Sequence, residues 1–485
     1  MRHTFDIRSV IRVLGQLVVL ESLIMLVPLV VCLIYGENDW RCFAVASVIS
    51  LAVGLVAMLA SGRSKTVVKV REGFVITALI WIVYGIFGMI PFMLCDIPLD
   101  LTDAMFETIS GFTTTGASAI IDVEAQSHGI LLWRALTQWI GGLGIILFLL
   151  AMLPELNRSS GISMFNAETS GITHDRLHPR IRQTALSLWS IYIVITCVSI
   201  LLLWLGPMDL FDSVCQSFAA IATGGFSTHN NGISYWHSDY VRLILIAVMI
   251  AGGINFMVFH AVWKKGVRQL IYNEVTRIFI GIVFVSFLML AVSIILGGED
   301  IDNCLVLPLF HVVSAITSTG FSISEAESWG EFSLCITIVL MICGSCAGST
   351  AGGMKVDRLI VLWRNLVNEI KKSIYPKRTY VVSLNGSFLQ NSLLSRVSAF
   401  VTLYIIIVLV STAVVTMYGY RFSDSLFMVS SCIGCNGLGY GATGAEGSYA
   451  SLPGMVKWLL TVIMVIGRLE LFSFIVLLLP SFWRK

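Results

Sequence analysis

Long apolar runs alternate with short polar segments along the whole chain. A helix needs about 20 apolar residues to cross a bilayer, and runs of this length recur from one end of the sequence to the other. We therefore predict two leading helices, at 11–35 and 41–61, followed by four similar units. Each unit has a first helix, predicted at 73–95, 182–206, 276–297 and 393–418. Each also has a second helix, predicted at 128–153, 239–264, 332–365 and 454–480.

Between the two helices of each unit lies a variant of one 14-residue pattern. The four copies are Asp103–Gly116, Asp212–Gly225, Leu307–Gly320 and Asp424–Gly437. Each copy predicts a short helix, at 103–113, 212–222, 307–317 and 424–434. Such a helix is too short to span a core about 30 Å thick, so we expect it to enter the membrane and turn back. The initial aspartates are expected to cap the free N–H groups of these helices.

The loop that closes each copy has the chemistry of a cation site. Glycine permits backbone angles that turn carbonyls inward, and the C-terminal end of each short helix is partially negative. A single loop of this kind is also compatible with an ordinary helix cap, but four copies at one spacing favour a ring of carbonyls around a pore. The candidate residues are Thr114, Thr115, Gly116, Thr223, Gly224, Gly225, Ser318, Thr319, Gly320, Cys435, Asn436 and Gly437.

Composition and charge agree with a membrane protein that crosses the bilayer many times. The 485 residues are 56% hydrophobic and only 12% charged, whereas soluble domains carry about 25% charge. Ten predicted spans place both ends of the chain on one side. Basic residues such as Arg8, Arg71 and Lys264 gather on that side, which the positive-inside rule makes cytoplasmic. The opposite loops are acidic, which favours cations at the outer mouth but also fits topology alone.

The second helix of the third unit contains a segment that should not stay helical. Residues 344–353 read GSCAGSTAGG, with glycines at Gly344, Gly348, Gly352 and Gly353. Each glycine weakens a helix by about 1 kcal/mol, so we predict an unwound segment below the loop ring, able to act as a gate. Close packing of small residues between helices is the alternative. Lys355 follows the segment and is expected near the cytoplasmic mouth.

Arg468 is a charged residue inside the last apolar run. An arginine at membrane depth usually faces a cavity or a partner. Glu470 is a poor partner because residues two apart point to different sides of a helix. We therefore predict that Arg468 faces the ion path and binds carbonyls of the 344–353 segment, with snorkelling to the interface as the alternative.

Other polar residues in apolar runs receive structural interpretations. Glu107, Gln216, His311 and Met428 occupy the same position of the four copies, and we interpret them as braces behind the loops rather than ion ligands. Glu21, in the first leading helix, is expected to hydrogen-bond a neighbouring helix.

Several motifs together resemble the TrkH/KtrB superfamily of potassium uptake proteins, and the bacterial TrkH type within it. They are SGFTTTGAS at 110–118, QWIGGLG at 138–144, ATGGFSTHN at 222–230, TSTGFS at 317–322, AGSTAGGMKV at 347–356, CNGLGYG at 435–441 and GRLELF at 467–472. The resemblance implies an all-α polytopic fold with four helix–pore loop–helix repeats around a pseudo-fourfold axis, preceded by two helices. It also implies a K⁺ filter lined by carbonyls of the twelve loop residues, a homodimer, and a cytoplasmic nucleotide-binding regulatory ring of the TrkA type. The fourth loop departs from the expected NNLGPGLG.

The sequence therefore predicts an N-terminal segment at 1–66 and four repeats at 67–160, 161–270, 271–385 and 386–485. The predicted function is potassium uptake across the bacterial inner membrane, with both termini cytoplasmic. The alternative is a proton- or sodium-coupled secondary cation symporter, although intramembrane acids are sparse. An enzyme is disfavoured because no nucleophile–base pair or metal cluster stands at membrane depth, and we expect no organic cofactor and no nucleic-acid partner.

Overall fold

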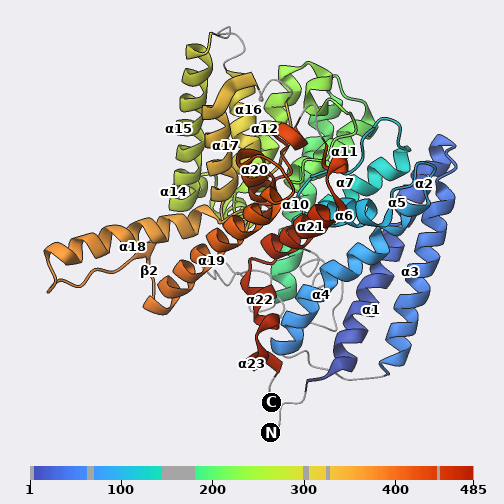
Figure 1. The fold of residues 1–485 in the computed structure, drawn as a ribbon, viewed down its shortest axis with the longest axis horizontal. Coiled ribbons are helices and arrows are strands. Elements are labelled where there is room, and N and C mark those ends of the chain that lie inside the picture. Colours follow the sequence, from blue (N-terminus) through green and yellow to red (C-terminus); the bar gives the residue numbers. More distant parts are fainter. Residues whose placement is uncertain are drawn as a thin grey trace.

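The protein is almost entirely helical in a computed structural model that describes residues 5–62, 70–144, 181–298, 305–323, 328–444 and 448–483. One hairpin of two short strands, β1 (Ser383–Leu384) and β2 (Ser387–Phe388), joins the third and fourth units. Figure 1 shows most helices running roughly parallel through the body, while one long helix extends sideways from it. Phe5 and Trp483 stack edge to face with ring centroids 6.0 Å apart, so the two described ends of the chain lie together.

The two leading helices are present as predicted. α1 (Ile7–Ile24) and α2 (Leu26–Tyr35) form one span of 29 residues, and α3 (Trp40–Ala60) packs against them. A Cβ built on Gly15 would lie 2.9 Å from the carbonyl oxygen of Gly54, so glycine allows this close approach. The expectation for Glu21 is wrong within the described residues, because its buried carboxylate has no hydrogen-bond partner there.

In the described parts of the chain, six helical segments are long and apolar enough to span a membrane. The number rises to eight if each of two bent helix pairs is counted as one span. The first helices of the four units are among the six. They are α4 (Val70–Gly88) continued by α5 (Ile90–Leu94), α10 (Ile181–Trp204), α15 (Glu274–Leu296) and α19 (Asn391–Thr416). α7 (His128–Gly142) covers the start of the predicted 128–153 helix, whose remainder lies largely outside the described residues.

The four short helices form close to their predicted positions. They are α6 (Leu101–Phe112), α11 (Leu210–Ile221), α16 (Val306–Ile316) and α20 (Phe422–Ile433). The predicted capping residues are wrong. Asp100 and Asp209 are the caps of α6 and α11, and their carboxylates accept from the backbone N–H groups of Asp103 and Asp212 at 2.7 Å.

Three of the four predicted second helices are interrupted. α12 (Asp239–Gly253) and α13 (Phe256–Lys265) meet at a bend of 96°, and α21 (Gly454–Arg468) and α22 (Phe472–Leu478) meet at 114°. The predictions of continuous helices at 239–264 and 454–480 are therefore wrong. α17 (Gly330–Cys343) and α18 (Val356–Ile374) are separated by an unwound segment, as the glycines of 344–353 indicate. The short helices α14 (Arg268–Tyr272) and α23 (Pro480–Trp483) complete the fold, with 3-10 turns at η2 (Gly232–Trp236), η5 (Gly441–Thr443) and η6 (Tyr449–Ser451).

Short helices and second helices contact one another in a closed order. α6 packs on α7, which packs on α11, and the series continues through α12, α16, α17, α20 and α21 back to α6. Each short helix also packs on the first helix of its own unit. The four short helices are thus linked into one closed series by the second helices.

Candidate functional site

The four loops share one backbone conformation. Two positions in each loop have a positive φ, separated by one residue. The first position holds a residue with a side chain, at φ between 50° and 56°: Thr114, Thr223, Ser318 and Cys435. The second holds glycine, at φ between 76° and 82°: Gly116, Gly225, Gly320 and Gly437. A residue with a side chain is strained in the left-handed region. Because all four loops have such a residue at the first position, the surrounding structure must hold this conformation.

The glycines at the second position bring the four loops together in a ring. A Cβ built on Gly116 would lie 2.0 Å from the carbonyl oxygen of Gly224, and one on Gly225 would lie 2.0 Å from that of Thr319. In the same way, a Cβ built on Gly320 would lie 1.6 Å from Asn436 O, and one on Gly437 would lie 2.0 Å from Thr115 O. Each contact joins one loop to the next, and the last returns to the first. No side chain larger than hydrogen fits at these positions.

The loops are buried and rich in oxygen. Thr114, Thr115, Thr223, Ser318 and Thr319 are all fully buried. Hydroxyl pairs brace two of the loops from within, at 2.8 Å between the Oγ1 atoms of Thr113 and Thr115 and at 2.7 Å between those of Thr317 and Thr319. In the fourth loop the amide of Asn436 donates to Ala315 O at 2.7 Å, which ties this loop to the preceding short helix α16.

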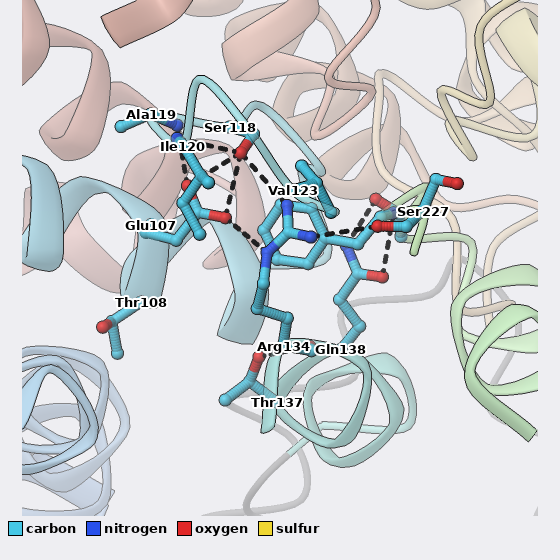
Figure 2. A network of polar contacts seen from close by, with 12 residues as sticks. Glu107, Thr108, Ser118, Ala119, Ile120, Val123, Arg134, Thr137, Gln138 and Ser227 are labelled. Atoms are coloured by element: carbon cyan, nitrogen blue, oxygen red, sulfur yellow. Dashed lines mark hydrogen bonds and ion pairs between the residues drawn. The ribbon is translucent and has the colours of Figure 1, made fainter. Parts of the chain in front are cut away.

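Two polar residues of α7 contact the loops, and the sequence reasoning assigned neither. Gln138 donates from Nε2 to the carbonyl oxygen of Gly224 at 2.6 Å, and its Oε1 accepts from the N–H of Phe226 at 3.2 Å. Arg134 donates from Nε to Glu107 Oε1 at 2.8 Å, and both side chains are buried (Figure 2). A charged residue inside the apolar 128–153 run was the available signal for Arg134.

The four residues at the shared position of the short helices differ in their partners. Glu107 Oε2 accepts from the N–H of Ala119 at 2.7 Å, just beyond the first loop. Gln216 donates to Ser227 Oγ at 3.2 Å, just beyond the second. His311 Nε2 lies 2.8 Å from Thr337 Oγ1 on α17, and Met428 is buried among apolar side chains. Glu107 and Gln216 thus bind residues just beyond their own loops, whereas His311 binds a neighbouring helix.

Residues 344–355, here called the crossing segment, contact the second, third and fourth units where their short helices end. Ser345 donates to Ile316 O at 2.9 Å, and the N–H of Thr350 donates to Gly252 O at 3.2 Å. A Cβ on Gly352 would lie 2.1 Å from Gly434 O. Gly344, Gly348, Gly353 and Lys355 all have a positive φ, between 65° and 75°. Backbone hydrogen bonds with neighbouring units thus replace those of a helix.

Arg468 reaches the crossing segment, as its position in the sequence suggested. Its Nη1 donates to the carbonyl oxygen of Thr350 at 2.7 Å. Its Nη2 donates to the carbonyl oxygens of Gly141 and Gly142 at 2.5 and 2.7 Å, which the sequence did not predict. Glu470 pairs with Arg358 of α18 rather than with Arg468. Lys355 is buried and donates to Ala351 O within the segment.

Carboxylates on the opposite side of the ring make ordered contacts. Asp103 of α6 pairs with Lys457 of α21, which also donates to Ala450 O at 2.8 Å. The amide of Asn230 donates to Asp122 Oδ1 at 2.9 Å and lowers the pKa of that exposed carboxyl below its usual value. Asp122 therefore remains charged at neutral pH and contributes a negative charge to this surface.

Comparison with known proteins gives one consistent result. A family of cation transport proteins, TrkH, matches residues 41–485. The chain is 34% identical to the Trk system potassium uptake protein TrkH of Escherichia coli (strain K12), with 99% of each chain covered. It is 31% identical to TrkG of the same organism over 100% of both chains. The crystal structure of the potassium transporter TrkH from Vibrio parahaemolyticus superposes with a TM-score of 0.89 at 30% identity, covering 99% of this chain and 100% of the other.

Proposed function

The chain belongs to the TrkH family of cation transport proteins, and on this basis we propose that it carries potassium ions into the cell. The ions would pass through the centre of the loop ring and bind there to backbone carbonyls. K⁺ is the transported ion in this proposal, and the protein needs no organic cofactor and performs no enzymatic reaction.

One observation carries the proposal, namely the cyclic contact of the four loop glycines with the carbonyls of the next loop. Carbonyl oxygens gathered around one centre can replace the water shell of a cation. The four short helices direct their partially negative ends toward the same centre. We propose the arrangement of four repeats around a pseudo-fourfold axis on this ground, with the twelve loop residues as the filter. The bond from Gln138 to Gly224 O uses one lone pair of that carbonyl, so the second loop is not equivalent to the others.

The crossing segment is the proposed gate. It is supported by the bonds of Arg468 to Thr350, Gly141 and Gly142, which fix a positive charge and a strand of backbone below the ring. A fixed cation there raises the barrier for K⁺. The glycines at 344, 348, 352 and 353 permit the segment to change conformation, and Lys355 lies at its end.

Further parts of the proposal rest on sequence pattern and family. The protein is a multi-pass component of the bacterial inner membrane with both termini cytoplasmic, surrounded by lipid. It forms a homodimer and binds a cytoplasmic nucleotide-binding ring of the TrkA type. The domain boundaries at 270/271 and 385/386 remain predictions, and those at 66/67 and 160/161 lie at residues outside the described ranges.

Radioactive rubidium uptake into liposomes that contain this chain alone tests the proposal. We expect Rb⁺ to enter down its own gradient and excess K⁺ to compete with it. Uptake that requires a proton or sodium gradient would support the alternative of a coupled symporter. No uptake in either condition, with a correctly folded protein, would contradict transport by this chain alone.

A further inference from the structure

A buried ion pair joins the first two loops from behind. Glu107 is 0% exposed and Arg134 is 2% exposed. Desolvated charges are tolerated only when their hydrogen-bonding capacity is satisfied. Glu107 meets this condition, because Oε1 accepts from Arg134 and Oε2 accepts from the N–H of Ala119 at 2.7 Å. The hydroxyl of Ser118 lies 3.1 and 3.2 Å from the two carboxylate oxygens.

Arg134 uses its remaining donors to reach both loops. Nη2 donates to Ser118 Oγ at 3.0 Å, two residues after Gly116, and Nη1 donates to the carbonyl oxygen of Ser227 at 3.0 Å, two residues after Gly225. The guanidinium carbon lies 4.1 Å from the ring centroid of Phe226, within range of a cation–π contact. Figure 2 shows Arg134 between Glu107 on one side and Ser227 on the other. The planar fork of arginine makes this double attachment possible, and a lysine could not reproduce it.

Gln138 extends the attachment one turn along α7. It lies four residues after Arg134 and therefore on the same face of the helix. Its amide binds Gly224 O and the N–H of Phe226. Gly224 O is also the atom that a Cβ on Gly116 would strike. A single helix thus holds the junction of the first and second loops both at the ring and just beyond it.

In the described residues, the ion pair that joins the first and fourth units, Asp103 with Lys457, stands at the start of α6 rather than at a loop, and the other two junctions have no such pair. At the junction of the third and fourth loops, the neutral amide of Asn436 donates to Ala315 O at 2.7 Å, and each of these loops has an internal serine bond. Ser314 Oγ donates to Phe321 O at 3.0 Å, and Ser431 Oγ donates to Leu438 O at 2.9 Å. Charge-assisted bonds are roughly twice as strong as neutral ones. The ring is therefore held most firmly between its first and second loops.

We propose that Glu107, Arg134 and Gln138 are positioning residues for ion selectivity, an inference that rests on the proposed function. They anchor the first two loops outward on α7 and prevent these loops from closing around an ion smaller than K⁺. The pair contributes no net charge, so it sets geometry rather than attracting ions. Without it, the loops move inward by the small distance that Na⁺ requires, and discrimination between K⁺ and Na⁺ falls.

The experiment compares Rb⁺ and Na⁺ uptake by liposomes containing the parent or a variant. Glu107→Gln combined with Arg134→Gln removes both charges, so no unpaired charge remains buried. We expect the Rb⁺/Na⁺ uptake ratio to fall by about tenfold, the effect of losing a charge-assisted hydrogen bond. Rb⁺ uptake itself should remain within about threefold of the parent, since the double variant removes none of the ring carbonyls. Arg242→Gln is the matched control, because Arg242 of α12 pairs with the exposed Asp239 at 2.9 Å and touches no loop.

Two further variants keep the test decisive if the double variant does not fold, which size-exclusion chromatography reports. Arg134→Lys retains the positive charge but loses the fork to Ser118 and Ser227, and Gln138→Leu removes only the amide contacts. Each should lower the Rb⁺/Na⁺ ratio, with Rb⁺ uptake retained. The inference is overturned if the Rb⁺/Na⁺ ratio stays within about twofold of the parent in every variant that folds. A twofold change corresponds to less than one ordinary hydrogen bond. Absence of Rb⁺ uptake by the parent contradicts the proposed function instead.

Discussion

The four loops and the four second helices of this protein differ sharply in how well they repeat. The loops have the same left-handed positions, with φ values that agree within a few degrees among the four copies. The second helices have different interruptions: bends of 96° and 114° in two of them, and the crossing segment in a third. Loops that surround one ion with carbonyls must each turn their backbone toward the same centre. A gate needs only one element that moves, so symmetry below the ring has no comparable physical advantage.

Residues of the third unit stabilise both bends. Asn255 caps α13 by accepting from the N–H of Met257 at 2.8 Å, and the N–H of Phe256 donates to Gly348 O of the crossing segment. At the other bend, Glu470 and Leu471 both have a positive φ, and Glu470 is held by Arg358. The irregular backbone is thus buried in protein, where it is tolerated at membrane depth.

The largest expected effect tests the repeated ring. Gly320→Ala places a methyl group 1.6 Å from Asn436 O at a φ of +76°. We expect Rb⁺ uptake to fall by at least about a hundredfold, because steric overlap at a strained φ displaces two loops together. Gly281→Ala is the control, since a Cβ on this α15 glycine meets nothing within 4 Å. Normal uptake by Gly320→Ala would contradict the close contact of the third and fourth loops.

The asymmetric region is tested by removing its central cation. Arg468→Ala deletes three hydrogen bonds to carbonyls in the crossing segment and α7. We expect Rb⁺ uptake to rise by about tenfold, because a charge-assisted bond holding the segment and a repulsive charge below the ring are both lost. Deleting residues from the 344–353 segment should also raise Rb⁺ uptake. Uptake unchanged in both variants would exclude the proposed gate.

A smaller effect is expected where the ring closes on itself. Asp103→Asn leaves Lys457 buried without its carboxylate partner. We expect a loss of about 2 kcal/mol in unfolding free energy, below the 3–5 kcal/mol of a fully buried pair because Asp103 is partly exposed. Denaturant unfolding in detergent measures this loss. Asp239→Asn, at the exposed pair with Arg242, should change stability by less than about 0.5 kcal/mol. Equal effects at the two sites would contradict a special role for the closing contact.

The smallest effect concerns the bend between α12 and α13. Asn255→Ala removes the cap of α13, and capping residues contribute about 1 kcal/mol. We expect a corresponding decrease in unfolding free energy, with the Rb⁺/Na⁺ ratio unchanged because the Asn255 side chain lies against Gly348 of the crossing segment and not against a loop carbonyl. Asn385→Ala is the control variant. Asn385 lies in the hairpin turn outside the ring, and its side chain likewise accepts from a backbone N–H, that of Glu274. A changed ratio in Asn255→Ala would mean that the bend and the ring are coupled.

The sequence predicted those features that local pattern controls. The short helices, the left-handed glycines and the unwinding of 344–353 follow from residue types at fixed spacing, since glycine has few substitutes in these conformations. The sharp bends near Asn255 and Glu470 were not predicted, although Gly252 and Gly253 precede the first bend and Gly467 precedes the second. Glycines of this kind also fit close packing between helices, and distant residues stabilise both bends. The same limit applies to Arg134, whose partners Glu107 and Ser227 are far apart in the sequence. The capping aspartates were misplaced by three residues because Asp100 and Asp103 offer the same side chain.

The contact between Asp103 and Lys457 joins residues 354 positions apart in the chain. The first and fourth loops also meet in the ring, where Gly437 faces Thr115 O. During synthesis the first loop enters the membrane before the fourth loop has been translated, so the ring cannot close until translation is nearly complete. A partly translated chain therefore lacks one side of the proposed ion path. The cell is thereby protected from ion leakage through an unfinished protein.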